Sequence, residues 1–472
     1  MTINGISGMF SRALDGLNVA QRGMSVVSNN IANVNTEGYS RQQFIQGTRA
    51  LFGDGTLGGG VLGLGITSIT DPFIERQLST ENSNWGTYDG RATTLSNVEQ
   101  VLSDADGSGL GSAISAFFNA WSDLGTNPAN GSYRSSVREK ARLVCDQFRS
   151  MNAQLNQLRS SLSSTISARV TQINDYTSQI ADLNRQIAMA SDEAAKSELK
   201  GQRQLVLNKL SQEIGVNYYE ASDGVMTVQI EGSGFSLVSR FDSATLSADD
   251  DPSAGGEMAI QATFPGTGGP SVDVTASIES GRLAGNLIDR NETLNDQIDN
   301  LDALAYNFTN EVNNLHQTGY GLDGVTNRNF FAPPGAQAGA SGSIQIDNSI
   351  LNSLDAIAAS GQDPSGGAVG DGSIATQIVA LRSANTMSSG SQTFNQFFTS
   401  MGTNVGITAG NVNSSLRAKA TLVSKLQEQR ESVSGVNLDE EAADLMRYQK
   451  AFEASARVLS VASDMMDTLL KL

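Results

Sequence analysis

Residues 3–34 read INGISGMFSRALDGLNVAQRGMSVVSNNIANV and contain an apolar repeat with a period of seven. One series of positions consists of Ile3, Phe10, Leu17, Met24 and Ile31. A second series lies three residues after each of these and consists of Ile6, Ala13, Ala20, Val27 and Val34. This spacing is typical of the a and d positions of a helix that packs along a partner helix. The alanines of the second series permit the partner to approach closely.

The other end of the chain, residues 438–472, repeats this pattern. Its main apolar positions are again seven residues apart: Leu438, Leu445, Phe452, Leu459 and Met466. Three acidic residues at 439–441 occupy the expected first turn, where the helix dipole favours negative charge. The pattern therefore predicts a second long helix at the C-terminal end.

Neither terminal helix can bury its apolar stripe alone. Each could pack on the rest of the chain, or the two could pair with each other and with neighbouring copies. Two long heptad helices at opposite ends of one chain favour pairing as a coiled coil. We predict an assembly interface of nine residues: Phe10, Leu17, Met24, Ile31, Leu438, Leu445, Phe452, Leu459 and Met466.

Between the two ends, apolar residues at steps of three and four predict a helical body. The longest stretch covers residues 137–190, where the pattern slips near Ile166 and then resumes. Such a slip changes the local supercoil without ending a helix. A shorter helix is expected over 199–214, and together the two predict a helical hairpin. Further helices are predicted over residues 287–315, 374–381 and 394–433.

Two segments between these helices differ in character. Residues 215–285 alternate apolar and polar residues in short runs separated by Gly, Pro and Asp, which predicts a small antiparallel β domain. Residues 317–372 are rich in Gly, Ala, Ser and Asn, and we interpret them as a loop-rich extension of that domain. The predicted fold is mainly α with β insertions and has three parts. These are paired terminal helices (1–36 and 437–472), a long helical-bundle body (37–214, 286–316 and 373–436), and β-rich outer insertions (215–285 and 317–372).

The charge and composition exclude several classes of partner and site. The chain of 472 residues has a formal net charge of −18, which repels nucleic-acid phosphates and anionic membrane surfaces. No apolar run is long enough for a transmembrane helix, so membrane insertion is not expected. The N-terminal residues lack the basic start, apolar stretch and cleavage site of a secretory signal.

One cysteine and one histidine leave little material for a zinc site or a Cys–His nucleophile pair. We therefore predict no catalytic residue, no metal and no cofactor. Cys145 flanks an apolar helix position and is expected to be a packed thiol. His316 falls at the end of a predicted helix, where we expect it to cap the C-terminus or to be solvated.

Three short motifs resemble known sites but lack their context. Residues 53–58 match G-x-G-x-x-G without the buried strand that a nucleotide site needs, so we expect a flexible loop. Residues 104–107 resemble part of a calcium loop but lack its closing glutamate, and we expect a turn. The acidic residues 249–251 are expected in a solvated loop of the β domain.

Longer motifs at both ends are more specific. The N-terminal motifs are ALDGLNVAQRGM at residues 13–24 and VSNNIANVNTEGYSRQ at residues 27–42, and the C-terminal motif is SGVNLDEEAADLMRYQKAF at residues 434–452. They resemble the terminal signatures of the bacterial flagellar rod and hook axial proteins. Three features make the chain most similar to the hook-associated members of that family: the sequence Tyr39-Ser40-Arg41, the run at residues 65–78, and the predicted hairpin at residues 137–214.

The resemblance implies a structural subunit, not an enzyme, that forms the junction between hook and filament and allows the filament to assemble. It implies several partners: copies of the chain in a ring, the flagellar hook protein, a second hook–filament junction protein, and a flagellum-specific export chaperone and export apparatus. Such a subunit leaves the cell through the flagellar type III system without a cleaved signal peptide and becomes part of the extracellular flagellum.

Two alternatives remain open. The chain could be another axial subunit, that is, a hook, rod or second junction protein, although the long helical hairpin argues against hook and rod. It could also be an enzyme with an active site in the β insertions and with termini that serve only for assembly. A pocket there with strongly perturbed carboxylates would favour the enzyme.

Overall fold

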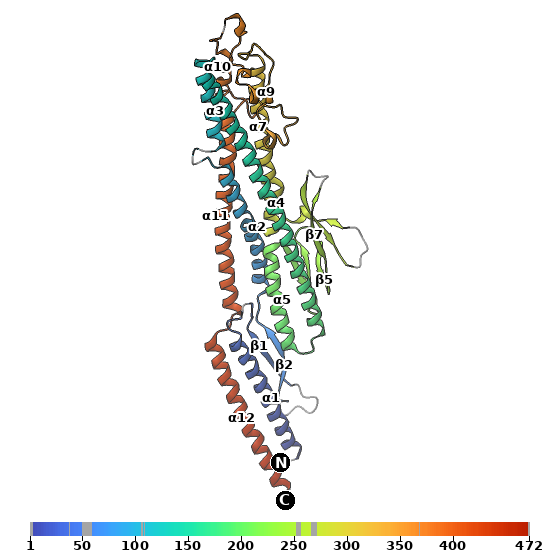
Figure 1. The fold of residues 1–472 in the computed structure, drawn as a ribbon. Coiled ribbons are helices and arrows are strands. Elements are labelled where there is room, and N and C mark those ends of the chain that lie inside the picture. Colours follow the sequence, from blue (N-terminus) through green and yellow to red (C-terminus); the bar gives the residue numbers. More distant parts are fainter. Residues whose placement is uncertain are drawn as a thin grey trace.

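A computed structural model describes residues 3–36, 38–49, 59–104, 107, 109–251, 256–265, 271–367 and 369–470. The molecule is elongated, and both ends of the chain lie at the same end of it (Figure 1). Two helices, α1 (Ile3–Ala32) and α12 (Leu438–Leu470), lie side by side there. The structure confirms that the fold is mainly helical and that the terminal helices pack together.

A β hairpin that the sequence patterns did not predict lies between this pair and the body. Its strands, β1 (Gln42–Thr48) and β2 (Val61–Ser68), are antiparallel. Phe44 of β1 packs on Val19 and Val26 of α1, on the flank that α12 leaves open. The strands were missed because glutamines and glycines interrupt the apolar alternation. The loop predicted at residues 53–58 lies outside the described residues.

The body is a bundle of long helices. The predicted hairpin is confirmed, because α4 (Gly131–Met189) is one helix of 59 residues and α5 (Glu193–Glu213) returns along it. The other long members are α2 (Pro72–Leu102), α3 (Leu110–Thr126), α7 (Leu294–Gln317) and α11 (Phe394–Ser434). Short helices α6 (Arg282–Ile288) and α10 (Ser373–Ala380) and a π-helical turn η3 (Asp289–Thr293) complete it.

The sequence patterns did not predict α2 because its buried face contains small and polar residues. Gly86 and Gly90 lie against the chain at Gln212 and Arg282. A Cβ at Gly86 would lie 2.2 Å from the carbonyl oxygen of Gln212, so any side chain there would force these segments apart. A search for apolar periodicity does not detect such a seam.

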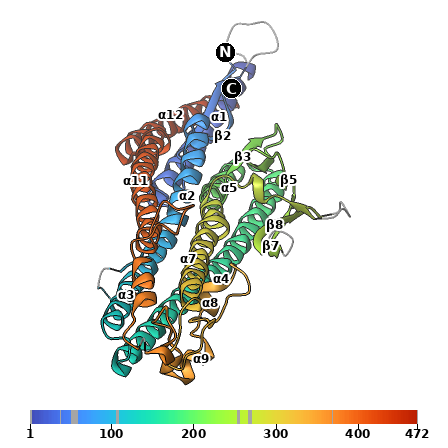
Figure 2. The same cartoon turned by 90° about the horizontal axis from the view of Figure 1, so that it is seen from above.

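The predicted β domain at residues 215–285 is confirmed as two antiparallel sheets. Four strands form the first: β3 (Val216–Glu220), β4 (Met226–Ile230), β5 (Ser236–Ser239) and β6 (Asp242–Ser243). Three form the second: β7 (Thr245–Asp251), β8 (Glu257–Thr263) and β9 (Val272–Asp273). Both sheets lie on the side of the body formed by α4 and α5, away from α11 (Figure 2). The acidic residues 249–251 lie in strand β7 and pair with β8, so the loop predicted for them is wrong.

The prediction of a β extension over residues 317–372 is also wrong. Among the described residues this segment contains short helices and turns: α8 (Ala340–Ser343), α9 (Asn348–Asn352), η4 (Leu354–Ala356) and η5 (Pro364–Gly366). The strand-like run around Ile346 forms one isolated bridge to Phe331. Aspartates 347 and 363 accept hydrogen bonds from backbone N–H groups two residues on, which favours turns over strands. The segment covers the body's far end, around α3, α4 and α7, instead of extending the β domain (Figure 1).

An aromatic cluster fills the core at that far end. Phe117 of α3 meets Phe308 of α7 edge to face at 5.4 Å, and Phe330 and Phe331 from the covering segment pack on both helices. The side chains of all four are buried. The segment 317–372 is therefore part of the body's core.

His316 is buried in this cluster, which contradicts the predicted capping or solvated position. Its Nδ1 lies 2.8 Å from the carbonyl oxygen of Arg328, and its Nε2 accepts a hydrogen bond of 2.8 Å from the N–H of Ala358. Burial lowers the pKa of His316 to about 4, so the ring is neutral and its Nδ1–H donates to Arg328. The histidine therefore connects two loops of the covering segment to α7. Cys145 is buried, as predicted.

Five asparagines attach other segments to the helices by the same geometry. Each amide accepts from the N–H and donates to the C=O of a single residue in another segment, much as a strand neighbour would. The pairs are Asn30 with Gln42, Asn174 with Leu246, Asn184 with Met226, Asn291 with Met258, and Asn313 with Phe331. The hairpin, both β sheets and the covering segment are therefore each fixed by an amide that satisfies one residue's backbone groups.

Asn184 offers a test of this geometry. Its side chain also bonds Arg203 and the carbonyl oxygen of Arg240, and Asn184 and Arg203 are both buried. We expect Asn184→Ala to lower the free energy of unfolding by about 2–3 kcal/mol, because buried backbone groups lose their partners. Urea unfolding with amide hydrogen exchange of β4 measures this. The control Asn156→Ala removes an amide whose hydrogen bonds are to Asn152 and Arg159 of the same helix, α4. Equal losses of stability in both variants would contradict the prediction.

Candidate assembly interface

The two terminal helices meet in one antiparallel register. A Cβ on Gly16 would lie 2.6 Å from Ser455 Oγ, and a Cβ on Gly23 would lie 2.4 Å from Tyr448 Cε1. One heptad further towards the body, Asn30 Nδ2 donates to Glu441 Oε2 at 3.0 Å. Seven residues towards the C-terminus of α1 thus correspond to seven residues towards the N-terminus of α12. The glycines let the helix backbones approach closely, because a side chain at either position would overlap the partner.

The residues buried in this seam are not those of the predicted series. Four buried side chains of α1, Ile6, Ala13, Ala20 and Val27, belong to the second series, whereas the buried Val19 and Val26 pack against Phe44 of the hairpin. In α12 the corresponding positions follow the predicted series by three residues, and two of them, Glu441 and Ala462, are 1% and 0% exposed. The sequence contained a signal for this side, because Gly16 and Gly23 are also one heptad apart.

The nine predicted interface residues lie beside the seam and keep surface exposed. Phe10 is 39% exposed, Phe452 38% and Leu438 51%. The other six are partly buried: Leu17, Met24, Ile31, Leu445, Leu459 and Met466. A single chain therefore leaves much of this apolar series uncovered, and its role in contacts with neighbouring copies remains a prediction.

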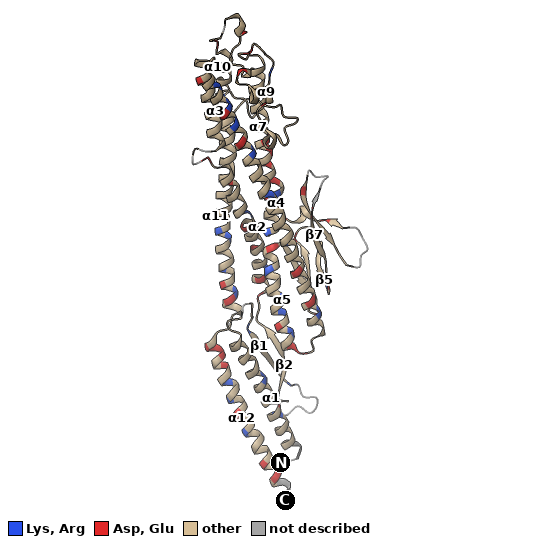
Figure 3. Cartoon of the chain, viewed as in Figure 1, with Lys and Arg blue, Asp and Glu red and all other residues tan. Residues whose placement is uncertain are grey.

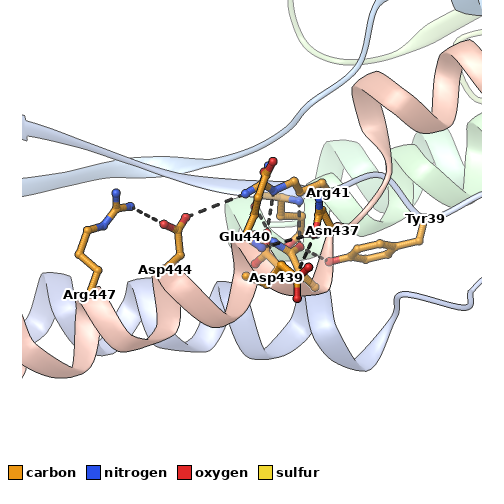
Figure 4. A network of polar contacts seen from close by, with 10 residues as sticks. Tyr39, Arg41, Asn437, Asp439, Glu440, Asp444 and Arg447 are labelled. Atoms are coloured by element: carbon orange, nitrogen blue, oxygen red, sulfur yellow. Dashed lines mark hydrogen bonds and ion pairs between the residues drawn. The ribbon is translucent and has the colours of Figure 1, made fainter.

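A polar network joins the two helices where they meet the hairpin (Figure 4). The Arg41 side chain donates to Glu441 Oε1 at 2.6 Å and to Glu440 Oε2 at 2.7 Å, both in the first turn of α12. Asn30 accepts hydrogen bonds from the hydroxyl of Tyr39 and from the N–H of Gln42, each at 2.9 Å. The network therefore links α1, the segment before β1, and α12.

The backbone of Arg41 connects the same point to the body. Its N–H donates to the carbonyl oxygen of Ser434 at the end of α11, and its C=O accepts from the N–H of Ile69 just before α2, each at 2.8 Å. Asn437 Oδ1 accepts from the N–H of Asp439 and caps the start of α12. The end of α11, the residues before α2 and the first turn of α12 thus all contact Arg41.

Electrostatics keep Tyr39 and Arg41 in fixed protonation states. Burial, together with the charges of Glu441 and Glu198, raises the pKa of Tyr39 to about 12, so its hydroxyl remains a donor. Burial alone would lower the pKa of Arg41, but the hydrogen bonds and charge of Glu441 outweigh this and raise it. Elsewhere, acidic and basic residues are interspersed along the body helices (Figure 3).

The carboxyl groups with shifted pKa values at residues 215–285 and 317–372 accept hydrogen bonds from backbone N–H groups. The pKa of Asp223 is lowered mainly by the backbone N–H of Val225, and that of Asp363 by Ser365. Both are capping groups of exposed turns. Within the described ranges, no group of three His, Cys, Asp or Glu residues could hold a metal ion. A search of the same ranges for a helix long and apolar enough to cross a membrane also found none.

Three family models match the chain. Residues 95–331 match the helical domain of flagellar hook-associated protein FlgK. Residues 427–472 match the C-terminal model of the flagellar basal body rod FlgEFG proteins, and residues 12–39 match the flagella basal body rod protein model. The two ends thus match models of rod-type axial proteins, and the middle of the chain matches the helical domain of FlgK.

Whole-chain comparisons agree. The chain is 27% identical to flagellar hook-associated protein 1 of Bacillus subtilis over 96% of both chains. It is 25% identical to flagellar hook-associated protein 1 of Salmonella typhimurium over 99% of this chain and 100% of that one. Its fold is similar to that of the flagellar hook junction protein FlgK from Burkholderia pseudomallei, with a TM-score of 0.68 and 20% identity, over 76% of this chain and 100% of that structure. The chain belongs to the family of flagellar hook-associated protein FlgK, a family of structural and not enzymatic flagellar proteins.

Proposed function

We propose that this chain is a structural subunit that forms the junction between hook and filament and allows the filament to assemble. Membership of the FlgK family carries the proposal. The apolar series that the terminal pair leaves partly exposed supports it, because a surface of this kind stays soluble only when it is covered. Copies of the chain in a ring would cover it, with the hook protein on one side and a second junction protein on the other.

Each part of the chain would have its own role in this assembly. Residues 1–36 and 437–472 would pair and contact neighbouring copies, with the nine predicted residues Phe10, Leu17, Met24, Ile31, Leu438, Leu445, Phe452, Leu459 and Met466 in the interface. The helical body would form the wall of the tube, and the β sheets at residues 215–285 would face outward. In this division residues 317–372 belong with the body, since they complete its aromatic core.

The proposal includes export through the flagellar type III apparatus without a cleaved signal peptide. A chain that passes through a narrow channel unfolded must not be crosslinked, and a single cysteine rules out an internal disulfide. A dedicated export chaperone would cover the apolar stripe of the C-terminal helix beforehand, which prevents aggregation.

Deletion of the gene tests the proposal, with a plasmid-restored strain as the control. We expect cells that carry finished hooks without filaments and that release flagellin into the medium, as seen by electron microscopy and immunoblotting. Missing hooks would instead identify a rod or hook subunit, and normal filaments would exclude any axial role.

A further inference from the structure

A heptad repeat does not determine by itself how two helices align. Slipping one helix by seven residues restores the match of apolar positions, so several registers compete. Yet the pairs described above, Gly16 with Ser455 and Gly23 with Tyr448, belong to a single register. Some other feature must therefore distinguish this register from its neighbours.

The polar residues at the body end of the seam differ between registers. Asn30 and Glu441 are each 1% exposed, and their side chains bond one another. Arg41, whose side chain is 21% exposed, donates to the same carboxylate. A buried carboxylate costs little when it is hydrogen-bonded and paired, and several kcal/mol when it is not.

We propose that Asn30, Arg41 and Glu441, which we call the register cluster, select the alignment of α1 with α12. A slip of one heptad away from the body would place Glu441 opposite Gly23, beside the buried Val26 and Val27 and without Arg41. The opposite slip would bring the bulky ring of Tyr448 against Asn30 and take Glu441 past the end of α1. Both shifted registers separate Glu441 from Asn30.

The connection of α12 to the body also affects the equilibrium between the registers. Residues 435–437 alone link α11 to α12, so this short linker opposes a shift of α12 by a whole heptad. Within the described residues, α1 also contacts both strands of the hairpin. The Arg41 backbone bonds to Ser434 and Ile69 therefore place the register cluster at a fixed point of the body.

Disulfide trapping in the purified full chain distinguishes the registers. Gly16→Cys with Ser455→Cys reports the observed alignment, because a Cβ on Gly16 would lie 3.4 Å from Ser455 Cβ, close to disulfide spacing. Met9→Cys with Ser455→Cys reports one slip, and Gly16→Cys with Ala462→Cys reports the other. All chains carry Cys145→Ala, so that only the introduced thiols react.

The variants Arg41→Gln and Glu441→Gln remove the charges of the register cluster with little change in shape. Arg457→Gln is the matched control, because it removes an arginine from an exposed position of the same helix. We expect the parent and the control to form almost only the 16–455 disulfide. In the cluster variants, the ratio of native to slipped disulfide is expected to fall by roughly 10- to 100-fold, which is less than for a fully buried ion pair because Arg41 is 21% exposed.

The double variant Arg41→Gln with Glu441→Gln adds a second criterion. If the two residues act as one unit, its ratio should fall by less than the product of the single effects, since each single change already breaks the pair. A parent chain that forms slipped disulfides would overturn the proposal. Cluster variants that keep the parent's ratio of native to slipped disulfide would also overturn it. So would variants that form none of the three disulfides, because the cluster would then be needed for the helices to pair and not for the choice of register. The inference does not rest on the proposed role at the hook–filament junction.

Discussion

Replacing Phe10 and Phe452 together with aspartate is expected to abolish filament attachment while leaving the folded body unchanged. In a single chain these side chains are 39% and 38% exposed and lie outside the core of the body, so the double change leaves that core intact. In a ring of copies, each new carboxylate would be buried against an apolar neighbour at a cost of several kcal/mol per site. The same penalty recurs at every subunit contact. We expect motility of the deletion strain to remain unrestored.

The measurement is swimming in soft agar together with electron microscopy of the hooks. The control Asn18→Asp with Gln449→Asp adds the same two charges to exposed polar positions of the same helices and should restore swimming. Thermal unfolding of each purified chain should match that of the parent. If the double phenylalanine variant swims as well as the control, the predicted apolar series is not the assembly interface.

Replacing His316 with alanine is expected to lower the free energy of unfolding by roughly 3–5 kcal/mol. The change leaves the C=O of Arg328 and the N–H of Ala358 without their partner and opens a cavity in the aromatic cluster. Trp121 packs edge to face on the imidazole at 6.3 Å, so its fluorescence reports this region directly. Urea unfolding of the Trp85→Phe background, in which Trp121 is the remaining tryptophan, measures the effect. His316→Gln, which keeps one donor and one acceptor, should lose less, and equal losses in both variants would contradict this account.

The same histidine predicts how stability depends on pH. Its pKa is lowered from 6.5 to about 4 in the folded chain, so the unfolded chain binds its proton first as the pH falls. The stability that His316 contributes is thus complete above pH 6.5 and decreases by about 3 kcal/mol as the pH falls towards 4. Burial raises the pKa of Asp289 from 3.8 to about 6, against the effect of Arg91, and this contributes with the opposite sign over the same range. His316→Gln should therefore gain stability relative to the parent between pH 7 and pH 4.5, and an unchanged difference would refute the assignment.

The sequence predicted several helices whose buried faces are apolar, but it missed α3, whose buried face is apolar as well. The repeat over residues 3–34, the hairpin of α4 and α5, and α7 all have large apolar residues at helical spacing, and the structure contains each of them. The predictions also failed where small or polar residues form the contact. Examples are α2, whose seam contains Gly86 and Gly90, and the β1–β2 hairpin, which Asn30 attaches through Gln42.

The sequence by itself determined that both ends are long amphipathic helices of a flagellar axial type, because heptads and terminal motifs are local properties of the chain. Only the tertiary structure decided which side of each helix forms the seam, since a glycine or a carboxylate is buried or exposed according to what lies opposite. Gly16 admits Ser455, and Glu441 is buried because Asn30 and Arg41, hundreds of residues away in the chain, satisfy it. The burial of His316 was decided in the same way, by the loop carbonyl and N–H groups that folding brings to the two sides of its ring.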